Sequence, residues 1–248
     1  MVREDDHFIT WYKFTEDRSR PRRVLLGARI GGVYVAELIL EPGAVAGNHY
    51  HKKTNSIFLV GRGKIRGGFE RVDDGERLDF TAEPGSGIMH LPPKTAVAIK
   101  NVVADKTVVI FFANRPFRSG DDVDFPIDLS LPDGEFDDAA EVATPIKRYR
   151  FQHDQSKPGR DLETAKVGGV YVSRLTLMPN VISGNLYHKK AKVILFVTSG
   201  FVRFRFKHVK SGETREFDLK PGGGIVHIPP YVAIANKNLG AEPATIMY

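Results

Sequence analysis

The stretch Gly47-Asn48-His49-Tyr50-His51-Lys52-Lys53 returns almost letter for letter as Gly184-Asn185-Leu186-Tyr187-His188-Lys189-Lys190. Side chains two residues apart lie on one face of a β-strand, so the His49 and His51 side chains point the same way if the first stretch is a strand. The apolar run at 57–60 that follows is typical of a strand. In the second stretch Leu186 replaces His49, and the copies therefore differ at one of these two positions.

The repeat extends far beyond this stretch. A constant shift of 137 positions aligns residues 9–111 with residues 146–248 without a gap, and roughly two in five aligned positions are identical. Internal duplication is the simplest explanation. We therefore predict an N-terminal domain at 1–112, an acidic interdomain linker at 113–145 and a C-terminal domain at 146–248. Within the linker we expect a short helix at 137–142.

Both copies indicate an all-β fold. The strand expected at 33–40 alternates, with Tyr34, Leu38 and Leu40 on one face, and the strand expected at 201–209 alternates between apolar and basic residues. Turn signals separate these runs at the spacing that an antiparallel sandwich or barrel requires. We expect exposed edges of such sheets to be buried, either between the two halves or in a homodimer.

The composition limits the chemistry and the partners. The 248 residues include no cysteine, so a metal site would have to use His, Asp, Glu or water. No secretory signal or membrane-spanning stretch is evident, and we expect a cytoplasmic protein with no membrane partner. The net charge of +6 favours anionic ligands weakly and argues against nucleic-acid binding. We interpret the basic run at 18–23 as a solvated loop in preference to a binding patch.

Several motifs together resemble those of the cupin superfamily. They are Gly43-x5-His49-x-His51 followed by an apolar strand and Gly63, then Pro84-Gly85, Pro92-Pro93 and Asn101. Because the resemblance covers both repeats, it implies two tandem jelly-roll barrels, a bicupin. More narrowly, the stretch 47–53 and the runs 111–117 and 204–213 are similar to the C-terminal cupin domain of capsular polysaccharide reductase-epimerases. That resemblance implies a nucleotide-linked keto-sugar as the ligand.

The resemblance also shows which metal ligands are missing. Metal-dependent cupins hold their ion with a His-x-His pair, a glutamate and a third histidine. His49 and His51 match the pair, but the glutamate position is Ser56 and the third histidine position is Val97. In the second copy the four positions are occupied by Leu186, His188, Val193 and Ile234. The resemblance therefore implies no metal in the C-terminal barrel, whose interior we expect to be apolar.

Two alternatives remain open for the N-terminal barrel. A divalent metal would be held by His49 and His51, with His90 as a candidate third ligand. Without a metal, His49, His51 and His90 are candidate acids and bases, as in the epimerases and ketoisomerases that the chain resembles. His51 and His90 recur in the second copy as His188 and His227, so both can also be read as residues that serve packing.

Other residues are candidates for ligand contact. Lys52 and Lys53 follow the site strand, where an ammonium group could approach a phosphate. Tyr34 and Arg66 are further candidates for contact with a ligand. Tyr50 is expected to face away from the histidine pair, because it lies between the two on the strand.

The sequence leaves the function between two classes. The first is an epimerase or isomerase that acts next to a carbonyl in the N-terminal barrel. The second is a non-catalytic bicupin that binds carbohydrate or serves in assembly. A metal-dependent oxygenase is disfavoured, because the glutamate and the third histidine are missing.

Overall fold

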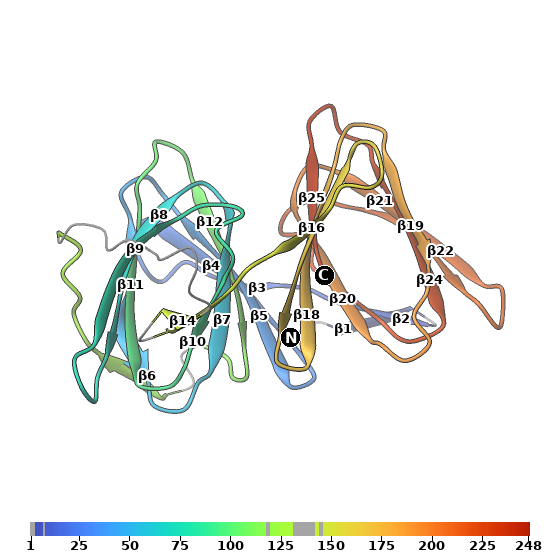
Figure 1. The fold of residues 1–248 in the computed structure, drawn as a ribbon. Helices are drawn as coiled ribbons and strands as arrows, with labels where there is room; N and C mark the ends of the chain where they lie inside the picture. Colours follow the sequence, from blue (N-terminus) through green and yellow to red (C-terminus); the bar gives the residue numbers. More distant parts are fainter. Residues whose placement is uncertain (1–2, 7, 118–119, 131–141, 144–145) are drawn as a thin grey trace. The chain divides into compact units, whose positions relative to one another are not determined.

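The computed structural model describes residues 3–6, 8–117, 120–130, 142–143 and 146–248, and the regular elements in these ranges are all β-strands (Figure 1). The predicted all-β fold class is therefore confirmed. Among the described residues there is no helix with the length and apolar character needed to cross a membrane. The short helix expected at 137–142 lies outside the described residues, apart from Val142, which begins a strand.

The chain folds into two compact units whose boundaries differ from those expected from the sequence. Residues 15–151 form the N-terminal barrel, and residues 1–14 with residues 152–248 form the C-terminal barrel. The first strand of each repeat has joined the barrel of the other: β2 (Ile9–Tyr12) pairs with β23 (Ile225–Ile228), and β15 (Ile146–Tyr149) pairs with β10 (Ile88–Leu91). β2 and β15 are equivalent in the repeat, so only strand pairing decides which barrel each one joins.

Two antiparallel sheets build the N-terminal barrel. The larger sheet has the order β14 (Val142–Ala143), β15, β10, β7 (Ser56–Arg62), β12 (Thr107–Ala113), β5 (Val33–Leu40), β4 (Arg23–Ile30) and β3 (Thr15–Asp17). The smaller sheet has the order β13 (Asp122–Asp124), β6 (Val45–His51), β11 (Thr95–Asn101), β8 (Ile65–Arg71) and β9 (Arg77–Ala82). The core lies between them.

The C-terminal barrel repeats this plan without a counterpart of β13 among the described residues. Its larger sheet has the order β1 (Arg3–Asp6), β2, β23, β20 (Val193–Ser199), β25 (Ala244–Met247), β18 (Val170–Leu177), β17 (Arg160–Val167) and β16 (Gln152–Asp154). Its smaller sheet has the order β19 (Ile182–Leu186), β24 (Val232–Asn238), β21 (Val202–His208) and β22 (Thr214–Leu219). The strand expected at 201–209 is thus an inner strand with partners on both sides, and it presents no free edge.

Aromatic side chains fill both cores. In the N-terminal barrel the Phe69 and Phe80 rings stack with centroids 4.5 Å apart. Gly67 gives them room, because a Cβ at this position would lie 2.5 Å from the Phe80 ring. Its equivalent in the other barrel is Phe204, which is fully buried and lies 6.4 Å from the Phe217 ring. The second copy therefore has an additional aromatic ring in its core, that of Phe204, where the first copy has Gly67.

A buried asparagine closes the same corner in each barrel. The Asn101 side chain donates from Nδ2 to Leu40 O at 3.0 Å and to Asp105 O at 2.7 Å, and its Oδ1 accepts from Thr107 Oγ1 at 2.8 Å. Asn238 repeats both donated bonds in the C-terminal barrel, at 2.9 and 2.8 Å. Both asparagines are fully buried. The asparagine of the second cupin-like motif thus has a structural role that the two repeats share.

We predict that Asn101→Ala and Asn238→Ala each destabilise their barrel by about 1–3 kcal/mol, the typical cost of a buried polar group left without its partner. The Asp variants at the same positions should also destabilise, since aspartate keeps the acceptor but loses both donated bonds. Thermal and urea denaturation of each variant measures the effect. Unchanged stability in both alanine variants would contradict this role.

A second prediction concerns Glu37, which is 3% exposed on β5. Burial raises the pKa of this carboxyl from 4.5 to about 7. The folded state therefore binds the proton more tightly than the unfolded state, so the stabilisation is present below about pH 4.5 and is lost as the pH rises through 7. Glu37→Gln is expected to raise Tm at about pH 8 and to change it little at about pH 5. Equal shifts at both pH values would refute this assignment.

Candidate functional site

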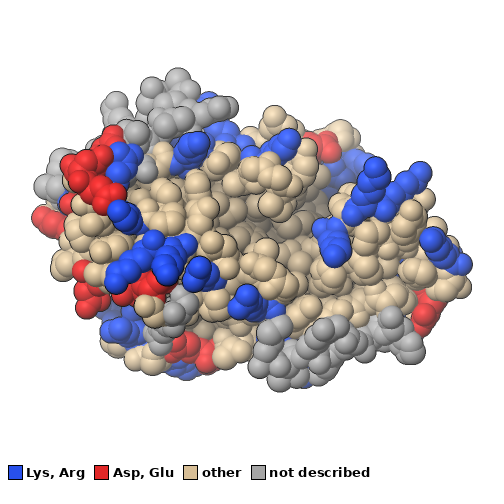
Figure 2. Space-filling view, turned by 90° about the horizontal axis from the view of Figure 1, so that it is seen from below, with Lys and Arg blue, Asp and Glu red and all other residues tan. Residues whose placement is uncertain are grey.

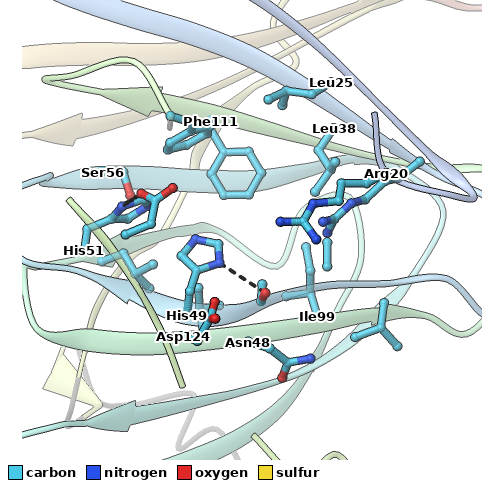
Figure 3. A pocket seen from close by; sticks show the side chains of 18 of the residues that line it. Arg20, Leu25, Leu38, Asn48, His49, His51, Ser56, Ile99, Phe111 and Asp124 are labelled. Atoms are coloured by element: carbon cyan, nitrogen blue, oxygen red, sulfur yellow. Dashed lines mark hydrogen bonds and ion pairs between the residues drawn. The ribbon is translucent and has the colours of Figure 1, made fainter. Parts of the chain in front are cut away.

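A cavity of about 690 Å³ opens inside the N-terminal barrel (Figure 3). Both sheets contribute to its wall: His49 and His51 come from β6, and Phe111 comes from β12 of the larger sheet. The other polar lining residues are Asp17, Arg20, Arg23, Asn48, Ser56, Asp122 and Asp124. A volume of this size is typical of sites for small molecules and cofactors.

A β-bulge at Gly47 and Asn48 turns the two histidines into the cavity. Gly47 has φ +95°, and a Cβ at this position would lie 2.2 Å from Val97 O. Asn48 has φ +59°, and the pairing of β6 with β11 shifts register next to it. Such a bulge inserts one residue and redirects the following side chains. The glycine of the motif is therefore required by the close approach of β11.

His49 is held as a neutral imidazole. Its Nδ1 lies 3.1 Å from Gly47 O, and since a carbonyl only accepts, Nδ1 carries the proton and Nε2 keeps its lone pair. Burial is the main cause that lowers the pKa of His49 below 6.5, and the charges of His51 and Arg23 add to it. The Gly47 carbonyl and Asp122 oppose this shift without reversing it. His49 can therefore accept a proton at neutral pH.

His51 is paired with a carboxylate. Its side chain is 8% exposed, and Nδ1 lies 2.7 Å from Asp122 Oδ1 and 3.5 Å from Asp121 Oδ1. The Nδ1–Asp122 contact is close but lacks the alignment of a hydrogen bond. The ring stacks on Phe117 with centroids 5.7 Å apart and meets the His49 ring edge-on at 4.9 Å. These contacts fix the ring beside its partner imidazole.

The acidic segment that we expected to form a linker supplies part of this site. β13 pairs with the free edge of β6, with Asp122 opposite His51 and Asp124 opposite His49. The carboxylate of Asp121 accepts hydrogen bonds from the Thr54 backbone N at 2.8 Å and from the Thr54 hydroxyl at 3.0 Å, and so ties the segment to the turn after β6. Residues 120–130 thus belong to the N-terminal barrel.

The basic run at 18–23, interpreted from the sequence as a solvated loop, contributes to the cavity. Arg20 and Arg23 line it together with Asp17, and Figure 3 shows Arg20 at the end away from His51. Arg20 is exposed and Arg23 is half-buried. Guanidinium groups in the wall of a cavity favour a ligand with phosphate or carboxylate oxygens.

Apolar side chains lie across the cavity from the imidazoles. Leu25 on β4, Leu38 on β5 and Phe111 on β12 all come from the larger sheet, and Figure 3 shows them across the cavity from His49. The same sheet also contributes Asp17, Arg23 and Ser56 to the lining. The titratable lining side chains are His49, His51 and the Asp and Arg residues already named. The two imidazoles and these apolar side chains therefore lie on opposite sides of the cavity.

Some residues predicted to belong to the site lie elsewhere. His90 does not line the cavity: its neighbour Leu91 does, and His90 points to the other face of β10, where Nε2 contacts Asn55 Oδ1 at 2.6 Å. The Lys52 and Lys53 side chains are exposed beyond the end of β6 and are not part of the cavity wall. Strand alternation directs His90 away from the interior, because its neighbour Leu91 faces inward. The two lysines lie outside because β6 ends at His51.

Tyr34 and Arg66 are also outside the lining set. The Tyr34 ring packs edge-on against Phe117 at 5.5 Å, so it supports a residue of the cavity wall. Arg66 lies on β8 beside the buried Ile65, on the outer face, where its charge acts on Asp128. Tyr50 faces away from the histidine pair, as expected, and packs on Phe125 at 6.2 Å.

The metal positions of metal-dependent cupins are not matched by this cavity. Ser56 and Val97 line it where the glutamate and third histidine would be needed. Among the described residues, the group of three potential ligands that lie within 4.8 Å of one another is His51, Asp121 and Asp122, and it does not include His49. Asp121 is already bonded to Thr54. The donor set of this cavity therefore does not match the four ligands of metal-dependent cupins.

The equivalent position in the C-terminal barrel is different. Leu186 is 49% exposed, and His188 is exposed as well. The interior is not wholly apolar, contrary to our expectation, because Asn236 Nδ2 donates to the Tyr248 hydroxyl at 2.6 Å next to the apolar core. Asn236 and Tyr248 occupy the places of Ile99 and Phe111. These two positions are not among the four motif positions 186, 188, 193 and 234, on which the expectation of an apolar interior rested.

The cavity residues that sequence reasoning missed include Arg20, Arg23, Phe117, Asp122 and Asp124. The arginines were visible as a basic run, and the aspartates were visible as an acidic segment after the repeat. The pairing of β13 with β6 brings the aspartates next to the histidines, and it joins residues more than seventy positions apart. The acidic composition of the segment after the first repeat was the sequence signal that could have suggested partners for the imidazoles.

Comparison with known proteins supports this architecture. Residues 27–124 match the model of a family described as the polysaccharide biosynthesis C-terminal domain. A search of curated protein sequences found no match. Among solved structures, a tryptophan-to-phenylalanine variant of Bacillus subtilis oxalate decarboxylase superimposes with a TM-score of 0.71 at 13% identity, covering 98% of this chain and 77% of that one.

An arginine-to-alanine variant of the same Bacillus subtilis enzyme is similar, with a TM-score of 0.70 at 14% identity and the same coverage. Identities this low establish the fold alone. The internal repeat, the two jelly-roll-like barrels and these neighbours agree with one another. The chain is a cupin-fold protein, and more narrowly a bicupin, with one cupin barrel in each of its two units.

Proposed function

We propose that the N-terminal barrel is an isomerase that moves a carbonyl group between neighbouring carbons of a sugar carrying an anionic group. The observation that carries this proposal is the pair of imidazoles on one wall of the cavity, opposite an apolar wall. The runner-up is a non-catalytic barrel that binds the same class of ligand, and the experiment below separates the two.

His49 supplies the base. Its Nε2 lone pair is left over once Nδ1 donates to Gly47 O, and burial keeps the ring neutral. A neutral imidazole can remove a proton from carbon next to a carbonyl when it lies within hydrogen-bond reach. The chemistry therefore begins at the hydroxyl-bearing carbon beside the carbonyl of the sugar.

His51 handles the proton on oxygen. As the proton leaves carbon, the carbonyl oxygen becomes negative and takes a proton from the His51 ring. The Asp122 carboxylate, 2.7 Å from Nδ1, balances the positive charge of that ring when both nitrogens are protonated. The product of this step is an enediol, with one proton on His49 and one fewer on His51.

The reaction completes in the reverse sense at the neighbouring carbon. His49 returns its proton to the former carbonyl carbon, and His51 takes the hydroxyl proton from the other oxygen, so the double bond moves and both rings regain their starting state. The rings lie 4.9 Å apart, a separation that suits proton transfer at adjacent atoms. No oxidant or further reactant is needed.

The arrangement favours isomerisation over epimerisation. Inverting a carbon requires a proton to leave one face and arrive on the opposite face. The side chains directly across the cavity from His49 are Leu25, Leu38 and Phe111, none of which exchanges protons. A transfer confined to one face is what two histidines on one strand support. The apolar side chains also favour a deoxysugar, because they offer no hydrogen-bond partner to a hydroxyl group.

The anionic end of the ligand is assigned to Arg20 and Arg23. Both guanidinium groups line the cavity, and Arg20 lies at its end away from His51, where it can hold phosphate oxygens. A nucleotide-linked sugar combines such a diphosphate with a keto-sugar. The partial match to the polysaccharide biosynthesis C-terminal domain supports this choice of ligand class.

To test the proposal, nucleoside diphosphate 4-keto-6-deoxysugars are incubated with the protein in D₂O and followed by proton NMR. We expect migration of the carbonyl, with deuterium at the former carbonyl carbon. His49→Gln should lower the rate by about a hundred- to ten-thousand-fold, the usual contribution of a general base. Asp122→Asn should lower it as well, since His51 then lacks a balancing charge.

The matched controls are His90→Gln and His188→Gln, which lie outside the cavity and should leave turnover unchanged. Binding without turnover would support the non-catalytic alternative. An inverted stereocentre in the product would contradict the one-sided mechanism. Loss of activity after dialysis against a chelator, restored by a metal, would overturn the metal-free assignment.

A further prediction concerns pH. His49 must be neutral to take a proton, so kcat/KM falls as the pH drops through its pKa. Because burial and the charge of His51 hold that pKa below 6.5, the midpoint of the acid limb should lie below pH 6.5. The pH–rate profile and an NMR titration of the His49 ring, assigned with His49→Gln, measure it. A midpoint above pH 6.5 in both would contradict the environment described for His49.

A further inference from the structure

The outer face of the smaller sheet in the N-terminal barrel is covered by the chain itself. β13 adds to the edge of β6, with Val123 opposite Tyr50. The Phe125 ring then packs on the Tyr50 ring at 6.2 Å, and Ile127 is 7% exposed against the small residues of β11. Residues 122–129 thus form an acidic segment, beginning with β13, whose apolar anchors shield this face.

Asn48 anchors the covering strand. Its backbone oxygen accepts from Phe125 N at 2.9 Å, and its Oδ1 accepts from Ile127 N at 3.1 Å. Lys52 N donates to Asp121 O at 3.0 Å on the other side of the pairing. The left-handed backbone of Asn48 therefore presents both of its acceptors to the strand that arrives.

The C-terminal barrel has the same receiving edge. Asn185 has φ +60°, close to the +59° of Asn48, and follows an equivalent glycine. In the part of the chain that the structure describes, β19 pairs with β24 alone and stands at the end of its sheet. Residues 185–190 are exposed, including Tyr187, which is 39% exposed where Tyr50 is covered. We call the outward surface of β19, β24, β21 and β22 the uncovered face.

The charge of this face has changed sign relative to its covered counterpart. The β8–β9 hairpin, residues 65–82, carries three arginines and five acidic residues. The β21–β22 hairpin, residues 202–219, carries five basic and three acidic residues. Its outward residues Arg205 and Lys207 stand where the first barrel has Gly68 and Glu70. The uncovered face is therefore more basic than the face that already receives an acidic strand.

An aromatic pair extends the uncovered face. The Tyr187 and Tyr231 rings lie 6.2 Å apart, and Lys210 lies 4.7 Å above the Tyr231 ring. The first barrel has the Lys94–Asp73 ion pair at this place. Figure 2, with the C-terminal barrel on its right, shows that Lys and Arg predominate over Asp and Glu on that side. An acidic chain with an aromatic residue would match both features.

We propose that the uncovered face binds an extended acidic segment of a partner protein, which adds as a strand to the edge of β19. Strand addition of this kind takes affinity from backbone hydrogen bonds and specificity from alternate side chains. The bound segment places an aromatic residue on Tyr187, as Phe125 lies on Tyr50. In the first barrel Gly68 leaves room for the Ile127 side chain. Arg205 stands at the equivalent position and leaves no such room, so the bound segment places an acidic side chain there, next to the guanidinium group.

The probe is a synthetic peptide of residues 120–130 of this chain, labelled with a fluorophore and titrated with the full-length protein. We expect saturable binding, tightened by Ile127→Glu in the peptide, since that change places a carboxylate beside Arg205. A peptide of the same composition in scrambled order should bind at least about tenfold more weakly, a difference of about 1.4 kcal/mol. Equal binding of the scrambled peptide would overturn the proposal.

Two N-methylated peptides test strand addition itself. Methylation at Phe125 removes the donor that bonds to Asn48 in the first barrel, and its equivalent bond would go to Asn185. Methylation at Asp124 alters the neighbouring amide, which points away from the receiving edge because bonds alternate along an antiparallel pair. The first peptide should lose binding and the second should retain it. If both bind equally, the contact is not a strand addition.

Protein variants locate the site. Arg205→Glu combined with Lys207→Glu should weaken binding of the unmodified peptide by about tenfold or more. The matched control is Glu70→Lys in the first barrel, whose equivalent face is occupied by residues 122–129, and it should leave the affinity unchanged. Circular dichroism confirms that the variants remain folded. Full affinity in the double variant, or an equal effect of Glu70→Lys, would refute the assignment to the uncovered face.

Discussion

The backbone of Gly47 lies so close to Val97 O that no side chain can be placed there, and much of the N-terminal barrel depends on this contact. The bulge that results turns His49 and His51 inward, and it leaves Asn48 in a left-handed conformation. Asn48 then offers two acceptors to Phe125 and Ile127. One close approach between β6 and β11 therefore sets both the orientation of the two imidazoles and the attachment of the segment that covers the back of β6.

The two repeats keep this constraint and use it differently. Gly184 has the same close approach, with a Cβ position 2.4 Å from Ile234 O, and Asn185 follows in the same conformation. Beyond the bulge the copies diverge. The first has two inward imidazoles and a covered outer face. The second has Leu186 at the place of His49 and an exposed basic outer face. Duplication preserved the scaffold, and substitution left the inward histidine pair in one barrel and a basic outer face on the other.

Charge is arranged along the cavity of the first barrel. Asp122 lies beside His51 and Asp124 is paired opposite His49, whereas Figure 3 shows Arg20 at the end away from His51. An anionic ligand is therefore oriented before any specific contact forms, because it is attracted by one end and repelled by the other. Phe117 closes the histidine end by stacking on His51, which reduces water access to the imidazole pair.

The sequence by itself determined the duplication, the all-β class and the inward-facing histidine pair. Each of these rests on local spacing or on repeated letters, which the linear order preserves. Only the tertiary structure decided that β2 and β15 exchange barrels, that His90 leaves the site, and that the acids after the first repeat join His51. Those outcomes depend on pairings between distant strands. Equivalent strands of a repeat can satisfy the same hydrogen bonds in either barrel, so local pattern carries no information about which pairing forms.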